Sequence, residues 1–347
     1  MPFTLNFNSN INTEILDVSV LEPFARINES IKIDSIIFDS EFNQPIPKLP
    51  TCIKNVKFGY NFNQDISNIG DHIESIIFEV ADFNYNLSTF PKGLRDLKID
   101  SYKISSRIEN INSGLENLTI LNNTFNDEIK LANTNIKSLK INSYIFNRSL
   151  QGLPPGLKSL EIDSEMFNSP LDELPAGLEY LKMSSPCRID FKQSIDNLPP
   201  GLKTLILENF NLSTQSLNNL PHGLEYLNLF LGYSDDIIDV NKCKQTLEHL
   251  PNSIIKMVLS NFWGDFNTIG DGVVELDIWF PRTSRIPHND LCTHIQHWKK
   301  LPSSLKILDI NKDKDNDTER VKYTQDIIDI IKTNINCNGI CINGIDM

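Results

Sequence analysis

The densest group of side chains that could do chemistry lies near residue 290. The segment HNDLCTHIQHW brings together His288, Asp290, Cys292, His294 and His297. His294 and His297 stand three residues apart, so on a helix they would share a face and could bind zinc. No second pair of Cys or His follows at the spacing that zinc sites use. The pattern therefore favours an exposed insertion loop over a metal site.

A second candidate is an acidic segment that resembles a calcium-binding loop. Its alternating carboxylates are Asp313, Asp315 and Asp317. Such a loop requires glycine at its sixth position and glutamate at its twelfth, where this chain has Thr318 and Thr324. We therefore expect a solvated acidic loop that leads into a helix.

The remaining sequence has no pattern typical of catalysis. It contains no phosphate-binding loop, no nucleophile elbow and no Gly-x-Gly-x-x-Gly motif. Cys337 and Cys341 stand four residues apart, but the six cysteines are otherwise scattered, as is typical of buried side chains in a reducing compartment. Carboxylates are abundant, and no spacing pairs them in a pocket. We expect no enzyme activity, no cofactor and no bound metal.

A repeat organises the chain. The unit Leu-Pro-x-Gly-Leu-x-x-Leu-x-Ile is clearest in LPPGLKSLEI from Leu153, LPAGLEYLKM from Leu174 and LPHGLEYLNL from Leu220. Its Leu-x-x-Leu-x-Ile core recurs at intervals of 20 or 21 residues at first and of 19 to 32 later. The cores begin at residues 33, 53, 73, 94, 115, 136, 157, 178, 202, 224, 254, 273 and 305. This regularity indicates a solenoid of stacked repeats.

The second half of each core has the alternation of a β-strand. Leu160 and Ile162 would face one side of a sheet, and Ser159 and Glu161 the other. One strand cannot bury its apolar face alone, so we expect neighbouring repeats to form a parallel sheet. The short repeat and its proline disfavour a long return helix. The predicted fold is a leucine-rich-repeat solenoid (α/β class, mostly β), with a curved parallel sheet of about 13 strands, an extended or short-helical convex side and terminal caps.

A Phe-Asn pair follows most of the cores. We expect each phenylalanine to stack on its equivalents in the core, and each asparagine amide to satisfy backbone groups where the chain leaves the sheet. For any single asparagine, the alternative is a solvated turn residue. The predicted ladder contains Asn43, Asn63, Asn84, Asn126, Asn147, Asn168, Asn211 and Asn267.

The Phe-Asn pair and the Leu-Pro-x-Gly-Leu-x-x-Leu-x-Ile core together resemble the FNIP repeat, a subfamily of leucine-rich repeats. The similarity covers about residues 31–310 and weakens after Phe230, where insertions lengthen three repeats. Such repeats are abundant in social amoebae and in giant DNA viruses of amoebae. Many such proteins resemble F-box proteins, whose N-terminal helical box recruits a ubiquitin ligase. Residues 1–30 contain no convincing box.

A solenoid must cover the apolar faces at its ends. We expect residues 1–30 to form an N-terminal cap, with Phe7-Asn8 as a relic of a repeat. Residues 31–310 would form the repeat array, and residues 311–347 a C-terminal cap. In that cap, the spacing of Val321, Ile327 and Ile331 predicts a helix from Thr318, and residues 340–345 are expected to add a strand.

Charge and hydropathy exclude several classes of partner. The formal net charge is -13, which disfavours binding to nucleic acid or to an anionic membrane surface. The N-terminal sequence has neither the basic nor the apolar region of a signal peptide, and no apolar run is long enough to span a membrane. We expect a cytoplasmic protein that is not secreted, located in the host cytoplasm if it is viral.

These features favour a non-catalytic scaffold that recognises a protein partner through its concave sheet face. The alternatives are the substrate-recognition subunit of a ubiquitin ligase, and a virion or structural protein. A row of lysines on that face could meet an acidic partner segment, or could merely offset carboxylates such as Asp100 and Asp163. Tyrosine and tryptophan could anchor the partner. The predicted contact residues are Lys57, Lys98, Lys140, Lys182, Tyr180, Tyr226 and Trp279.

Overall fold

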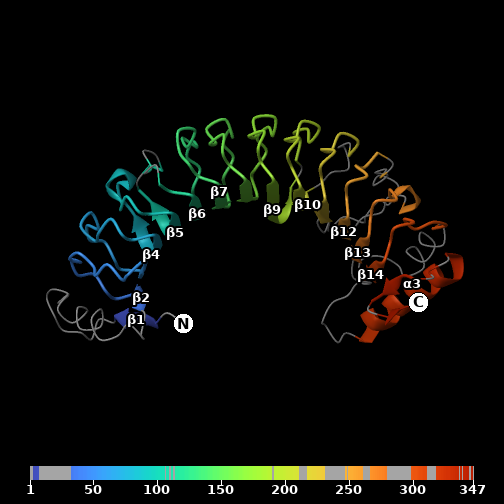
Figure 1. Ribbon diagram of the computed structural model, residues 1–347, viewed down its shortest axis with the longest axis horizontal. Coiled ribbons are helices and arrows are strands. Elements are labelled where there is room, and N and C mark those ends of the chain that lie inside the picture. Colours follow the sequence, from blue (N-terminus) through green and yellow to red (C-terminus); the bar gives the residue numbers. More distant parts are fainter. Residues whose placement is uncertain are drawn as a thin grey trace. The chain divides into compact units, whose positions relative to one another are not determined.

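The computed structural model is a parallel β-solenoid, and the residues that it describes contain very little helix. The chain divides into two compact units, Met1–Phe167 (unit one) and Asn168–Met347 (unit two). In each unit, the strands lie edge to edge and the connecting loops run on the side away from them (Figure 1). The structure describes residues 3–7, 33–105, 107–108, 111, 114–189, 191–210, 217–230, 247, 249–260, 266–279, 298–310, 318–335, 337, 339–343 and 345–346.

The first unit is a ladder of strands in which each pairs in parallel with the next in sequence. Its first strand lies within the segment predicted to cap the array, and pairs with the first repeat as a further repeat would. The strands are β1 (Phe3–Phe7), β2 (Ile33–Phe38), β3 (Asn55–Phe58), β4 (Ser75–Phe83), β5 (Asp96–Ile104), β6 (Asn117–Leu121), β7 (Ser138–Asn142) and β8 (Ser159–Asp163).

The second unit has the same arrangement of parallel strands and ends in a short hairpin. Its parallel strands are β9 (Tyr180–Ile189), β10 (Thr204–Phe210), β11 (Tyr226–Phe230), β12 (Lys256–Ser260), β13 (Glu275–Trp279), β14 (Ile307–Ile310) and β15 (Cys341–Ile342). β15 then pairs antiparallel with β16 (Ile345–Asp346), so the predicted final strand is in fact two. The thirteen predicted strands correspond one to one with β2 to β14, which confirms the repeat assignment.

The core lies between the strands and the connecting loops (Figure 1), and it is built from the predicted apolar columns. In β8, Leu160 and Ile162 are buried while Ser159, Glu161 and Asp163 are only partly covered. Behind the strands, the phenylalanines of the Phe-Asn pairs stack. The Phe146 ring is 5.9 Å from that of Phe125 and 6.0 Å from that of Phe167, with interplanar angles of 8° and 7°. Stacking identical side chains at the repeat spacing fills the core without changing the backbone from one repeat to the next.

A β-turn precedes most strands and accounts for the Leu-Pro-x-Gly-Leu motif. In the repeat of β8, the Leu157 N–H donates to the Pro154 carbonyl at 3.1 Å. The same bond joins Leu178 to Pro175 at 3.0 Å. Proline fits here because its carbonyl accepts, while its missing N–H is not needed. The turn delivers the first core leucine to the interior just before the strand begins.

Helix is scarce among the described residues, as the short repeat predicted. The loop side contains short 3₁₀ turns, η2 (Leu87–Thr89) and η3 (Phe266–Thr268). The predicted C-terminal helix is confirmed as α3 (Thr318–Asn334), where Ile327 and Ile331 are fully buried. Val321 lies on this helix, but its side chain falls outside the described residues.

Candidate binding face

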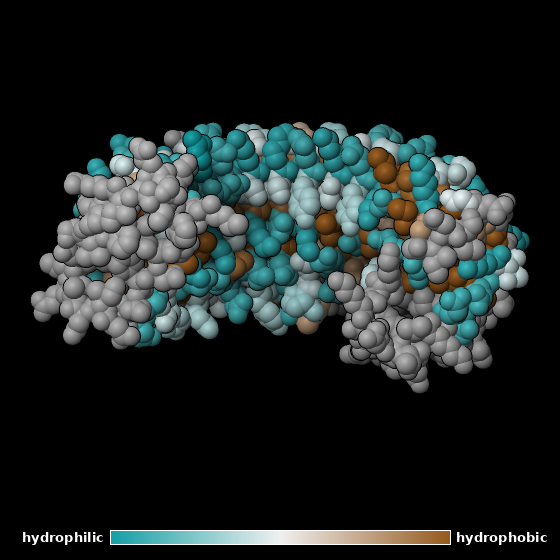
Figure 2. Space-filling model, turned by 60° about the horizontal axis from the view of Figure 1, so that its bottom comes forward, coloured by the Kyte–Doolittle hydropathy of each residue, from teal (hydrophilic) through white to brown (hydrophobic). Residues whose placement is uncertain are grey.

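The side chains that alternate with the buried ones form the outward face of each sheet. In unit one, the register places Lys57, Ile77, Lys98, Thr119 and Lys140 in a single column, each beside its neighbour on the next strand. Lys182 holds the same position in unit two, beside Ile206. The predicted lysines therefore occupy equivalent positions in their repeats. Hydrophilic residues dominate the described surface in the view of Figure 2.

Each of these lysines lies next to a carboxylate. The partner can be directly opposite on the next strand, diagonal to it, or two residues on in the same strand. These arrangements are all within reach across a sheet. The pairs are Lys57–Glu79 at 2.8 Å, Lys98–Asp100 at 3.3 Å, Lys140–Glu161 at 2.8 Å and Lys182–Glu208 at 2.9 Å. The ion pairs support the alternative interpretation of the row, that the lysines offset nearby carboxylates.

The predicted aromatic anchors lie on the outward face of unit two, in two columns. Tyr180 and Tyr226 flank Thr204 in the first outward column. Trp279 belongs to the third column, next to Ser260. All three side chains are partly buried. Lys256 follows Tyr226 in the first column, and its pKa is raised because it hydrogen-bonds Glu275 and lies near Asp277.

Sequence reasoning missed two tyrosines on the outward side of unit one. Tyr60 and Tyr102 are 48% and 80% exposed, and their rings meet edge to face with centroids 5.9 Å apart. They line a hollow of about 360 Å³ over β2 to β5, together with Asp39, Glu79 and Asp100. A signal was present in the sequence, because Tyr60, Tyr102 and Tyr144 recur every second repeat, at intervals of 42 residues.

The Phe-Asn asparagines link one repeat to the next near the protein surface. The amide oxygen of Asn43 accepts the backbone N–H of Asn63 at 2.9 Å, and that of Asn126 accepts the N–H of Asn147 at 3.0 Å. Asn84 donates to the Asn63 amide oxygen at 3.1 Å. In unit two, the amide oxygens of Asn168 and Asn267 accept the N–H groups of Lys192 and Lys299. Asn211 lies outside the described residues.

A second polar column, also missed, is buried. It stands two residues after the last apolar residue of the strand core, and contains Ser101, Asn122, Ser143, Ser164 and Ser185. The Ser143 hydroxyl donates to the Phe125 carbonyl at 2.7 Å, and the Ser164 hydroxyl to the Phe146 carbonyl at 2.9 Å. These bonds satisfy carbonyls that the turning chain would otherwise bury unpaired. The recurrence of serine at one position of the repeat was the available signal.

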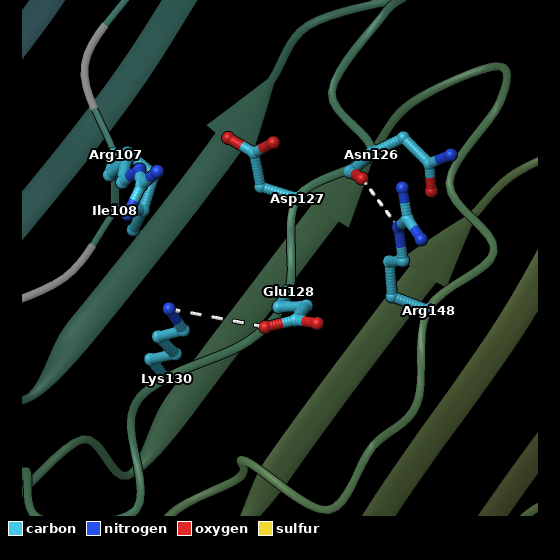
Figure 3. A pocket seen from close by; sticks show the side chains of 7 residues that line it. All are labelled: Arg107, Ile108, Asn126, Asp127, Glu128, Lys130 and Arg148. Atoms are coloured by element: carbon cyan, nitrogen blue, oxygen red, sulfur yellow. Dashed lines mark hydrogen bonds and ion pairs between the residues drawn. The ribbon is translucent and has the colours of Figure 1, made fainter.

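A hollow on the loop side of unit one has mixed charge (Figure 3). Lys130 lies 3.9 Å from Glu128, and the Arg148 guanidinium donates to the Asn126 carbonyl at 2.6 Å. Arg107 comes from a different loop and Asp127 points away from Glu128 (Figure 3). Because cations and carboxylates are interspersed here, the lining has no single charge preference.

Most of the side chains weighed as metal ligands in the sequence lie outside the described residues. His288, Asp290, Cys292, His294 and His297 lie outside the described residues, as do Asp313, Asp315 and Asp317. Cys337 and Cys341 are free thiols, and burial raises the pKa of Cys337. Within the described residues, no group of three or more His, Cys, Asp or Glu side chains could hold a metal ion.

Comparison with known families identifies the repeat. The FNIP Repeat family model matches residues 42–80, which span β3, most of β4 and two Phe-Asn pairs. No curated protein matches the chain. Among the described helices, none has the length and apolar composition needed to cross a membrane.

Proposed function

We propose that this chain, which belongs to the FNIP-repeat family, is a non-catalytic scaffold that binds a protein partner through the outward face of its sheet. One observation carries the proposal. Within a single column of unit one, the outward residues are Lys57, Ile77, Lys98, Thr119 and Lys140, while the adjacent core columns contain only apolar residues. Packing in the core requires apolar residues at the buried positions of each strand. The residue types at the outward positions are free to suit a ligand.

The outward aromatic residues of unit two support the same function. Tyr180, Tyr226 and Trp279 stand on strands and not in the loops, so their backbone positions are rigid. Tyrosine and tryptophan anchor interfaces well, because they bury a large area with few rotatable bonds. The proposed contact set is therefore these three residues in unit two, together with the outward lysines of each unit, which are Lys57, Lys98 and Lys140 in unit one and Lys182 in unit two.

The test is affinity purification of the full chain from its native cell, followed by mass spectrometry and binding measurements on the recovered partner. Tyr180→Ala combined with Tyr226→Ala should weaken binding by at least about 2 kcal/mol without unfolding the chain. Lys130→Ala, on the loop side, is the matched control. Normal binding by the tyrosine variant together with weak binding by the control would place the contact elsewhere.

The purification also separates the two more specific roles. Recovery of a cullin-type ligase core would identify a substrate-recognition subunit. Many proteins with FNIP repeats resemble F-box proteins, which have this role. Recovery in assembled particles would identify a virion or structural protein. In either role we place the protein in the cytoplasm.

A further inference from the structure

The hollow over β2 to β5 has features that the general scaffold function does not require. Its walls are the rings of Tyr60 and Tyr102, which are largely exposed although packed against each other. Its volume of about 360 Å³ is at the small end for a ligand site. The space suits one or two long side chains of a partner, not a folded element.

The floor of the hollow is backbone. Gly59 follows β3 at the position where β4 has Glu79 and β5 has Asp100. A Cβ atom at Gly59 would collide with the carbonyl oxygen of Asp39 in the preceding repeat, so no side chain can fill this place without a backbone shift. Glycine at this position allows the backbones of two neighbouring repeats to approach closely and form the floor of the hollow.

The lining has a net negative charge. Asp39, Glu79 and Asp100 contribute three carboxylates and Lys57 one ammonium group, for a net charge of -2, and adding the nearby Lys98 still leaves -1. The Glu79 and Asp100 side chains keep 43% and 44% of their surface exposed despite their ion pairs. Asp39 is oriented by accepting the backbone N–H groups of Glu41 and Phe42. A cation entering the hollow would therefore meet accessible carboxylate oxygens.

The aromatic rings of the hollow add to its preference for a cation. The face of a tyrosine ring carries negative electrostatic potential and attracts Lys ammonium and Arg guanidinium groups. Lys57 and Lys98 are each paired with one carboxylate of the lining, and Asp39 adds a third carboxylate, so the excess negative charge favours a cationic ligand over an anionic one. We infer that the hollow lined by Tyr60, Tyr102, Glu79 and Asp100 binds an arginine or lysine side chain from a basic segment of the partner protein.

The inference rests on the proposed scaffold function and names the chemistry of the partner. The probe is a fluorescein-labelled (Arg-Gly)₄ peptide, with (Ser-Gly)₄ as the uncharged comparison, titrated with the full chain and followed by fluorescence anisotropy. Tyr102→Ala should weaken binding of the arginine peptide by at least about fivefold, whereas Tyr102→Phe, which keeps the ring, should bind as wild type. Asp100→Asn should also weaken binding, and raising the salt concentration should weaken it further.

The matched control is Tyr144→Ala, which removes a tyrosine that is 51% exposed and does not line the hollow. If Tyr102→Ala and Tyr144→Ala bind the peptide equally, the attraction is to the acidic chain in general, and the hollow is not the site. Binding of the serine peptide as tight as that of the arginine peptide would also overturn the inference. Neither result affects the scaffold function, which the tyrosine variants of unit two test with the native partner.

Discussion

The Ser143 hydroxyl donates a hydrogen bond of 2.7 Å to the carbonyl oxygen of Phe125, one repeat earlier in the chain. Ser143 is fully buried. Replacing it with alanine leaves that carbonyl without this donor in a place that water does not reach. We expect Ser143→Ala to lower the free energy of unfolding by about 1–3 kcal/mol. Ser138→Ala, on the outward face of the same strand, is the control, and equal losses in urea denaturation would mean that the buried column contributes nothing specific.

The packing of the core gives a second prediction. Leu160 is fully buried, and Leu160→Ala should lower the free energy of unfolding by about 2–5 kcal/mol because it opens a cavity between stacked repeats. Glu161 is the next residue, points outward and pairs with Lys140, so Glu161→Ala should cost less than about 1 kcal/mol. Chemical denaturation of both variants measures the difference. Similar losses would show that the two strand faces are assigned wrongly.

The asparagine ladder gives a third prediction. Asn126→Ala removes the acceptor for the Asn147 N–H and should lower the free energy of unfolding by about 0.5–1.5 kcal/mol. Asn126→Asp keeps an oxygen at that position and should recover most of the loss. Asn123→Ala, at an exposed position nearby, serves as the control. Failure of aspartate to recover stability would show that the amide oxygen is not the group that matters.

The fourth prediction concerns pH. The pKa of Glu116 is lowered because its carboxylate hydrogen-bonds and attracts Lys137, and also pairs with Arg95. A carboxyl whose pKa is lower in the folded state stabilises the fold above its ordinary pKa, here 4.5, and loses that contribution as the pH falls through the lowered value. Glu116→Gln should therefore be less stable than wild type at neutral pH, with the gap closing in acid. A gap that stays constant with pH would contradict this account.

The fold was largely predictable because each repeat presents the same pattern to its neighbours. The alternation of Leu160 and Ile162, repeated in every core, determines both the strand and its parallel partner. The C-terminal helix was also predictable, since isoleucines such as Ile327 and Ile331 recur at helical spacing. In both places, local pattern and tertiary packing agree.

The candidate site was less predictable because it depends on contacts across strands. Lys57 and Glu79 are 22 residues apart and meet only when the register is known. The tyrosines recur every 42 residues, but Tyr60 stands two residues after the last core residue of its strand and Tyr102 three after, so the interval alone does not show that their rings meet. The buried column that includes Ser143 was overlooked because serine alone usually indicates an exposed turn.

The most direct test of the scaffold function is photo-crosslinking in the native cell. A benzoylphenylalanine placed at Thr119 or Asn228 points outward from the sheet, and one placed at Lys130 lies on the loop side. We expect the same partner protein to be cross-linked from both outward positions and not from Lys130. Cross-linking of a partner from Lys130 alone, with none from Thr119 or Asn228, would contradict binding through the outward face.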